Sequence, residues 1–365
     1  MTSPTQDDAT VVSTLTSTAA PDAPTTRPAA NSRSDAPAGY PRLVADIGGT
    51  NARFGWVAAP GAPVTQVRKL SVPDFAGPAE AARAYLDERA RLSDADGRPP
   101  CHAAFAVATA VGGDHIAFTN SHWAFSRQAV QAALGLDSLL MLNDFESLAL
   151  SLPRLGAAQL RAHGDVLPQA NGTLAVVGPG TGLGVGAVVQ VPQGLWVALP
   201  GEGGHATLAP ADELESALLA CVRRQFSHVS AERLLSGIGL PVLYQALGQV
   251  NGSPAAVRTA AEIVEHGLAR QDALCSQTLD VFCALLGGFA GNVALTLGAR
   301  GGVYIGGGIV PRFADRFFAS AFRQRFEAKG RFQPYLAAIP TALITDTLAA
   351  LSGAALAIEQ AVAQA

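Results

Sequence analysis

The sequence contains few charged residues, because Asp, Glu, Lys and Arg make up only 15% of it, against about a quarter in an average globular domain. Aromatic residues are also scarce at 6%, whereas hydrophobic residues reach 49%, so we expect a core built mainly from Ala, Val and Leu. The formal net charge is -4 and no run of Lys and Arg occurs, which argues against a nucleic-acid surface and against a lipid anchor. We therefore expect a small-molecule partner, with no nucleic acid and no membrane.

The spacing of a cysteine metal site is also missing. The cysteines show no CxxC pair and no His-rich neighbourhood, so neither a zinc site nor a disulfide framework is indicated. Scattered cysteines in apolar segments are usually buried thiols, and a reducing cytosol suits them, so we predict a cytoplasmic protein. These cysteines are Cys101, Cys221, Cys275 and Cys283.

Residues 1–40 lack the apolar run of a signal peptide, and their four aspartates are atypical of a transit peptide. Thr, Ser, Ala and Pro dominate this segment, so we predict a disordered N-terminal tail. Residues 281–299 are uncharged and long enough to be considered as a membrane span. Four glycines and an Asn dilute this stretch and no basic flank orients it, so we predict a buried helix of a globular protein.

Strand-like apolar runs alternate with Ala-rich helical patterns along the rest of the chain, as is typical of α/β layers. At 365 residues the chain exceeds what one core usually supports, so we predict two lobes. Strand patterns occur at 103–111 and 138–144, and strand, glycine turn and strand patterns at 43–57 and 173–189, while a strand enters three glycines at 301–311. Helices are predicted at 212–226, 230–237 and 344–362, the first two with Asp212 and Ser230 as N-caps.

The turn in ADIGGTNAR is the first candidate ligand site. Its adjacent glycines, Gly48 and Gly49, let backbone N–H groups converge on phosphate oxygens. Thr50 and Asn51 add donors, and Asp46 at the strand end is suited to a hydrated Mg²⁺. Two glycines alone more often form an ordinary hairpin.

A second glycine-rich turn, GPGTGLGVG at 178–186, places small residues around Thr181. It is not a P-loop, since no GK[ST] follows, and neither turn is a GxGxxG that opens a helix. The two turns together therefore indicate phosphate binding outside the dinucleotide-binding fold.

Six motifs in one order carry a resemblance to bacterial glucokinases of the proteobacterial type, from about Leu43 to the C-terminus: ADIGGTNAR, LNDFESLAL, GPGTGLGVG, PGEGGH, VSAERLLSG and GGVYIGGGI. That family belongs to the superfamily of actin, Hsp70 and sugar kinases. The resemblance implies a two-lobed α/β fold of the actin-like ATPase (ribonuclease H-like) type, with the active site in the cleft between the lobes. The implied small lobe comprises residues 41–154 and 345–365, and the large lobe residues 155–344.

The resemblance also implies the reaction, which is ATP-dependent phosphorylation of glucose at its 6-hydroxyl to give glucose 6-phosphate. By similarity, the two hairpins would grip the phosphates of ATP, and Asp46 would organise Mg²⁺ through water. The third glycine motif would pass close to the adenosine. The implied nucleotide-binding residues are Ala45, Asp46, Ile47, Gly48, Gly49, Thr50, Asn51, Gly180, Thr181, Gly182, Gly306, Gly307 and Gly308.

Phosphoryl transfer needs an acceptor hydroxyl held in line and a base for its proton. Asp144 ends a predicted strand, and the Asp of the NDF motif is the general base in the family, although a lone Asp after a strand is otherwise a common turn former. Carboxylates, amides and imidazole suit vicinal sugar hydroxyls. By resemblance the hexose contacts are Asn143, Asp144, Glu202, His205 and Glu232, with Asn120 as a candidate from a loop that resembles one lining the sugar cleft.

Three alternatives stay open at this point. One sequence does not fix the preferred hexose, and polyphosphate would suit the phosphate turns as well as ATP. A non-catalytic sugar-binding regulator is the third, which the retention of Asp46, Asp144 and both turns argues against.

Repressor-type relatives carry a CxCGxxGC zinc signature, which does not follow His205 here, and this indicates the zinc-free branch. Relatives are commonly homodimers, which implies a homodimer.

Overall fold

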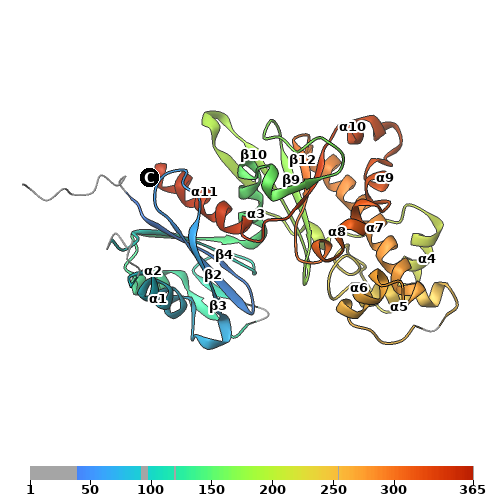
Figure 1. Ribbon diagram of the computed structural model, residues 1–365, viewed down its shortest axis with the longest axis horizontal. Coiled ribbons are helices and arrows are strands. Elements are labelled where there is room, and N and C mark those ends of the chain that lie inside the picture. Colours follow the sequence, from blue (N-terminus) through green and yellow to red (C-terminus); the bar gives the residue numbers. More distant parts are fainter. Residues whose placement is uncertain (1–38, 92–97, 119–120, 254, 365) are drawn as a thin grey trace, which may run out of the picture. The chain divides into compact units, whose positions relative to one another are not determined.

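The computed structural model describes residues 39–91, 98–118, 121–253 and 255–364. The predicted tail therefore lies outside the described residues except for its last two positions, and so does Asn120. Two mixed β-sheets and the helices around them form the described part of the chain (Figure 1). The predicted α/β class is present.

The first sheet has the strand order β3-β2-β1-β4-β7. β1 pairs with β2 in antiparallel orientation across the first glycine turn, as predicted, and β1, β4 and β7 run parallel. The carboxyl ends of these three strands meet at one edge, where Ile47, Val107 and Asn143 lie in register. The strands are β1 (Arg42–Ile47), β2 (Asn51–Val57), β3 (Thr65–Ser71), β4 (His102–Val107) and β7 (Ser138–Asn143).

The second sheet has the strand order β11-β10-β9-β12-β13-β8. Its antiparallel β9–β10 pair flanks the second glycine turn, as predicted, and β12 runs parallel to β9 before the third glycine motif. The strands are β8 (Leu160–Ala162), β9 (Leu174–Pro179), β10 (Leu183–Gln190), β11 (Trp196–Leu199), β12 (Gly302–Ile305) and β13 (Thr341–Ile344), while β5 (His115–Ala117) and β6 (Ala124–Ser126) form a separate pair.

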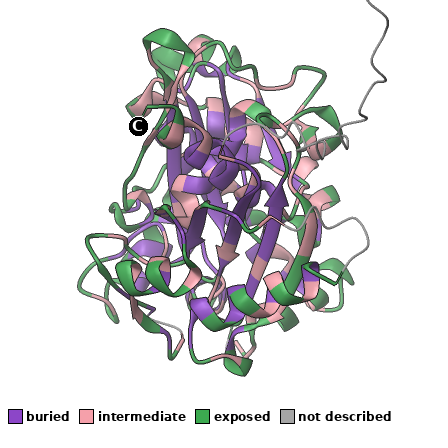
Figure 2. Cartoon of the chain, turned by 90° about the vertical axis from the view of Figure 1, so that its left-hand side faces the viewer, coloured by how far each residue is buried: buried purple, intermediate pink, exposed green. Residues whose placement is uncertain are grey.

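Side chains of successive strand residues alternate between different hydrophobic cores. On β1, Ala45 belongs to a core shared with α1 and α2, whereas Val44 belongs to a core built around α3 and α11. On β9, Val176 joins that same α3–α11 core, and Val177 faces a core shared with α4 to α10. These strands are buried on both faces (Figure 2), which explains their continuous apolar sequences.

The helices cover both faces of the sheets. α11 packs against α3, β4 and β1, in keeping with the predicted return of the C-terminus to the first lobe, although the lobe boundaries stay a prediction. The helices are α1 (Pro78–Arg89), α2 (Arg127–Leu134), α3 (Asp144–Ser151), α4 (Glu213–Val222), α5 (Leu240–Val250), α6 (Ala260–Leu268), α7 (Ala273–Leu297), α8 (Ala314–Phe318), α9 (Phe322–Glu327), α10 (Gln333–Ala337) and α11 (Ala349–Ala363).

α7 is the helix predicted for residues 281–299, and it is long and apolar enough to cross a membrane by length and composition. It packs against α9, α6 and α5, and 72% of its most apolar window is buried inside the fold. This packing supports the prediction of a buried core helix.

Four sequence predictions need correction. Residues 230–237 form successive turns and no helix, because Ala231 N and Glu232 N donate to the carbonyl oxygens of Ala206 and Gly204 instead of staying within one helix. The final helix begins at Ala349 and not at 344, since the first of those residues belongs to β13. The strand predicted for residues 103–111 is β4, which ends at residue 107. Cys101 is exposed, whereas the other three cysteines are buried as predicted.

Candidate active site

The first glycine turn is tied down by backbone hydrogen bonds. Gly48 N donates to Asn51 O at 2.9 Å, and Val72 N, just after β3, donates to Thr50 O at 3.0 Å. The Thr50 side chain is exposed at the tip. The turn is thereby fixed at the carboxyl end of β1, with its polar side chains open to a ligand.

Asp46 occupies the last-but-one position of β1, and its side chain is 18% exposed. Burial raises the pKa of this carboxyl, while the positive charge of Arg53 lowers it in part. Arg53 Nη1 donates to Asp46 Oδ2 at 2.9 Å from the paired position on β2. Arg53 was not among the predicted site residues, and a charged side chain in an otherwise apolar strand was the signal that could have found it.

Asp144 is the first residue of α3, and a capping box fixes this helix start. Asn143 is the N-cap, and its Oδ1 accepts from Phe145 N at 2.9 Å and from Glu146 N at 3.4 Å, while Glu146 Oε2 accepts from Asn143 N at 3.3 Å. Asn143 Nδ2 also donates to Thr109 O at 3.3 Å. The predicted sugar contact at Asn143 therefore coincides with a structural cap, with one side-chain N–H left over.

The Asp144 carboxyl is partly withdrawn from water, and burial raises its pKa to about 6. A hydrogen bond from Phe145 N to Asp144 Oδ1, at 2.9 Å, opposes this rise, whereas the negative charge of Asp46 adds to it. The two acids thus lie near enough to affect each other. An ionised carboxylate with a raised pKa is a stronger proton acceptor than an ordinary Asp, which suits a general base near neutral pH.

Three of the predicted sugar-binding side chains, Glu202, His205 and Glu232, come together in the structure. His205 Nε2 lies 4.0 Å from Glu202 Oε2, and His205 Nδ1 lies 3.9 Å from Glu232 Oε1. A tight turn, Gly203–His205, aims the first two, and Glu232 N donates to Gly204 O at 2.9 Å. Glu202 and His205 are exposed, so the cluster offers carboxylate and imidazole groups to a polyhydroxylated ligand.

Glu232 also joins this cluster to the second glycine turn. Its Oε2 accepts from Leu183 N, at the start of β10, at 2.9 Å. A Cβ added to Gly182 would overlap that same carboxylate oxygen, so a larger residue there would have to displace the Glu232 carboxylate. The predicted sugar side and phosphate side therefore share one residue.

The third glycine motif packs along β9. Gly306 N donates to Val177 O at 2.9 Å. Gly307 has a φ of +75°, in the left-handed region, and an added Cβ would overlap Pro179 O, so glycine is required twice over. Gly307 and Gly308 are exposed, which leaves a surface without side chains beside the second turn.

The donor set near the two acids fits a hydrated Mg²⁺. Among the described residues, no group of three or more His, Cys, Asp or Glu side chains could hold a metal ion, and Asp46 and Asp144 are the acids at this sheet edge. Mg²⁺ commonly keeps several waters and is held by one or two carboxylates together with substrate phosphates. One or two carboxylates are what this edge supplies.

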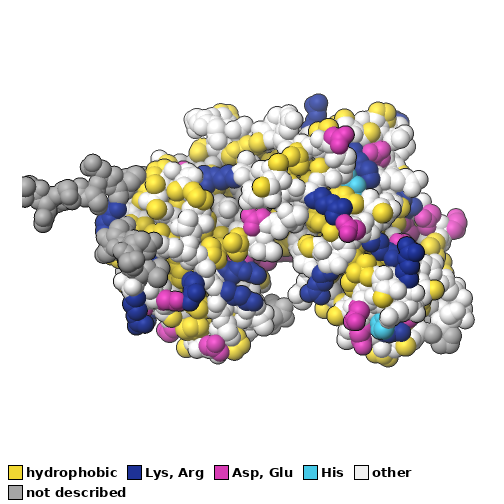
Figure 3. Space-filling model, in the orientation of Figure 1, with side chains coloured by type: hydrophobic (Ala, Val, Ile, Leu, Met, Phe, Trp, Pro, Cys, Tyr) yellow, Lys and Arg dark blue, Asp and Glu magenta, His cyan; other side chains and the backbone are white. Residues whose placement is uncertain are grey.

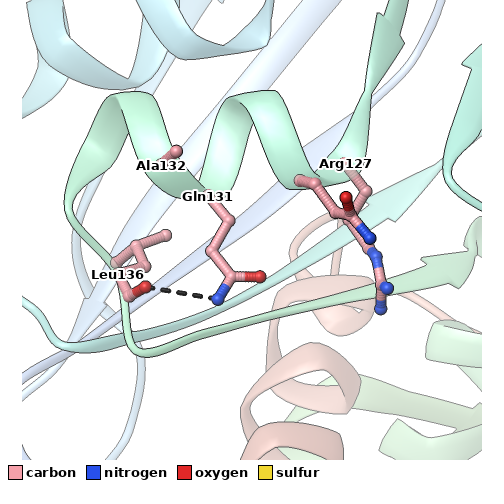
Figure 4. A pocket seen from close by; sticks show the side chains of 5 residues that line it. Arg127, Gln131, Ala132 and Leu136 are labelled. Atoms are coloured by element: carbon pink, nitrogen blue, oxygen red, sulfur yellow. Dashed lines mark hydrogen bonds between the residues drawn. The ribbon is translucent and has the colours of Figure 1, made fainter.

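The surface also carries features that involve none of the predicted site residues. A depression of about 500 Å³ along α2 is lined by Arg127, Gln128, Gln131, Ala132 and Leu136, none of which is a predicted site residue. Gln131 Nε2 donates to Leu136 O at 3.3 Å within it (Figure 4). On the face drawn in Figure 3, basic and acidic side chains are interspersed.

Comparison with known proteins gives one consistent result. The family model for glucokinase matches residues 43–361. Glucokinase from Chromobacterium violaceum is 49% identical over 319 residues, covering 87% of this chain and 89% of its own length. Glucokinase from Neisseria meningitidis is 46% identical over 322 residues, covering 88% of this chain and 96% of its own length.

Solved structures agree with this result. A glucokinase from an Antarctic psychrotroph superposes with a TM-score of 0.81 at 35% identity, over 88% of this chain and 99% of that one. A Balamuthia mandrillaris glucokinase solved in complex with glucose has a TM-score of 0.68 at 20% identity, over 88% of this chain and 93% of that one, and supports the fold alone. The predicted actin-like sugar-kinase fold is confirmed.

Proposed function

This chain belongs to the glucokinase family, and on that premise we propose that it transfers the γ-phosphoryl group of ATP to the 6-hydroxyl of glucose. The observation that carries the proposal is the sharing of Glu232 between the sugar cluster and the second glycine turn. The base candidate Asp144 begins the helix that packs on the same β9–β10 pair. Neighbouring elements would thereby supply the sugar-binding cluster, the base and the phosphate-binding turn.

In the proposed reaction, Glu202, His205 and Glu232 bind the hexose, and the free N–H of Asn143 contributes a further donor. Asp144 accepts the proton of the 6-hydroxyl while the sugar's hydroxyl oxygen bonds to the γ-phosphorus. The bond between the γ-phosphorus and the bridging oxygen breaks, and ADP leaves. Because the nucleophile is weak and the transition state is loose, positioning and charge stabilisation supply most of the rate. Thr50 and Thr181 face the phosphates from the two turns.

We also propose that Asp46 holds Mg²⁺ through water, and that Arg53 keeps this carboxylate oriented by its hydrogen bond. When bound, Mg²⁺ shields the charge of the β- and γ-phosphates. Adenosine would lie against the exposed glycines Gly307 and Gly308, where no side chain obstructs it. Among the implied nucleotide contacts, Ala45 and Ile47 are buried in the strand and would act through their backbone or by packing.

The test is the release of ADP from ATP with and without glucose and Mg²⁺, for the wild type, Asp144→Asn and Asp165→Asn. Asp165 is an exposed acid outside the site, so its substitution is the matched control. We expect glucose-dependent release that falls about 10²- to 10⁴-fold in Asp144→Asn and is unchanged in the control. Unaltered turnover in Asp144→Asn would remove this residue from the mechanism.

The same assay separates the alternatives. Comparing glucose with mannose and amino sugars identifies the hexose, and replacing ATP with polyphosphate identifies the donor. Binding of glucose without any phosphoryl transfer would indicate a sugar-binding regulator.

We further propose that the protein works in the cytoplasm, where ATP and glucose meet at the entry to glycolysis, and that it forms a homodimer. The proposal of a homodimer follows the implied behaviour of relatives. Light scattering coupled to size exclusion would measure the assembly, and a mass near 37.3 kDa would show a monomer instead.

A further inference from the structure

Phe145 directly follows the base candidate in sequence, and its ring lies on two glycines of the second sheet. A Cβ added to Gly184 would overlap the ring at Cδ2 and Cε2, and a Cβ added to Gly178 would overlap Cζ and lie 2.6 Å from Cε1. Gly178 and Gly184 are directly paired across β9 and β10. The pair forms a notch with no side chains, and the Phe145 ring occupies it.

The notch is close to the phosphate-binding turn and rigidly connected to it. Gly178 and Gly184 each lie three residues from Thr181, and Gly180 N donates to Gly182 O at 2.8 Å to close the turn between them. Glycine inside a strand weakens that strand and often marks a site where another group approaches closely. The close approach here is that of the Phe145 ring, so these two glycines serve packing and not a ligand.

The other end of Phe145 is fixed to the base. Its backbone N–H is held by Asn143 Oδ1 and Asp144 Oδ1, both at 2.9 Å. The ring and the Asp144 carboxylate therefore belong to one rigid first turn of α3. Gly186 extends this contact, because a Cβ there would lie 2.8 Å from Phe145 O.

We propose that Phe145 is a positioning residue, whose ring, seated in the Gly178–Gly184 notch, sets the distance between Asp144 and the phosphate-binding turn that carries Thr181. This inference rests on the proposed function. In this proposal the ring acts by packing and not by contact with substrate, so its removal should change the alignment of base and γ-phosphate and leave the binding groups in place. A misplacement on the order of 1 Å costs up to about 10²-fold in rate.

The test is a double-mutant cycle of Phe145→Leu, Gly178→Ala and the double variant. Leu lacks the Cζ and Cε1 atoms that the methyl group added by Gly178→Ala would overlap, so Phe145→Leu should relieve that clash and leave a 3.3 Å contact with Gly307 N. The control cycle uses Gly186→Ala, whose methyl meets the main-chain oxygen of residue 145, which the Leu variant retains. Steady-state kcat, KM for ATP and KM for glucose are measured for each, with a thermal melt.

We expect Phe145→Leu to lower kcat about 10- to 100-fold with both KM values within about twofold of the wild type. The kcat of Gly178→Ala should be lower than that of Phe145→Leu, and the double variant should recover most of this further loss, since only the contact with Gly307 N remains. Adding Phe145→Leu to Gly186→Ala should recover nothing. Wild-type kcat in Phe145→Leu, or effects of Phe145→Leu and Gly178→Ala that simply multiply, would overturn the inference while leaving the proposed function standing. An inactive wild type would overturn both.

Discussion

Replacing Asp144 with Asn should stabilise the protein, even though it removes the proposed base. Burial raises the folded-state pKa of this carboxyl from 3.8 to about 6, so the folded protein binds a proton more tightly than the unfolded chain does. Ionisation of the Asp144 carboxyl therefore destabilises the wild-type fold. This destabilisation is absent well below pH 3.8, grows as pH rises through the window between 3.8 and 6, and is complete above 6. A difference of this size corresponds to about 3 kcal/mol at pH 8 and about half of that at pH 5.

Asn is the appropriate substitution because its amide is close in shape to the carboxylate and its oxygen still accepts the hydrogen bond from Phe145 N. Urea unfolding of the substrate-free protein at pH 8 and pH 5 measures the gain, with Asp165→Asn as the exposed control. We expect the stabilisation by Asp144→Asn to be about twice as large at pH 8 as at pH 5. A variant that is destabilised at pH 8, or whose gain does not decrease toward acid, would refute the reasoning.

Two further predictions concern the fold. Burial among Phe317, Phe318 and Phe322, together with the charges of Arg323 and Arg161, lowers the pKa of His163 to about 4. The stability of the protein should therefore fall as pH decreases from 6.5 to 4. His163→Leu should flatten that fall in thermal melts, whereas an identical acid response of the variant would contradict the assignment. On α7, an added Cβ at Gly288 meets nothing within 4 Å, but one at Gly291 lies 2.5 Å from Phe326 O. Gly288→Ala should raise the free energy of unfolding by about 1 kcal/mol and Gly291→Ala should lower it by about 1–3 kcal/mol, and equal effects in urea unfolding would disprove this packing argument.

Strand and turn positions could be predicted from the sequence because they depend on local patterns. Continuous apolar runs marked β1, β4, β7 and β9, and paired glycines marked the turns between antiparallel strands. The prediction of a helix at residues 230–237 was wrong because it relied on a local capping pattern. In the structure, backbone N–H groups of this segment donate to the carbonyl oxygens of residues 204 and 206 instead. Such contacts between loops leave no periodicity in a sequence.

The candidate site was predicted in its residue types but not in its connections. The six motifs named Asp46, Asp144, Glu202, His205 and Glu232, and in the structure His205 lies within about 4 Å of both Glu202 and Glu232. The hydrogen bond from Leu183 N to Glu232 and the ion pair of Asp46 with Arg53 were not predicted, since each joins segments whose proximity only the folded sheets create. The roles of these residues in catalysis stay proposals.

Glycine is required at different positions of GPGTGLGVG for different reasons, which the neighbouring atoms distinguish. Gly178 and Gly184 accommodate the Phe145 ring, Gly186 accommodates the α3 backbone, and Gly182 accommodates Glu232. At Gly180 an added Cβ would meet only Gly182 O, at 4.0 Å, so within this motif packing does not require glycine at that position. A requirement for glycine at position 180 in a kinase assay would therefore have to come from the close approach of a bound phosphate, because the fold itself has room for a methyl group.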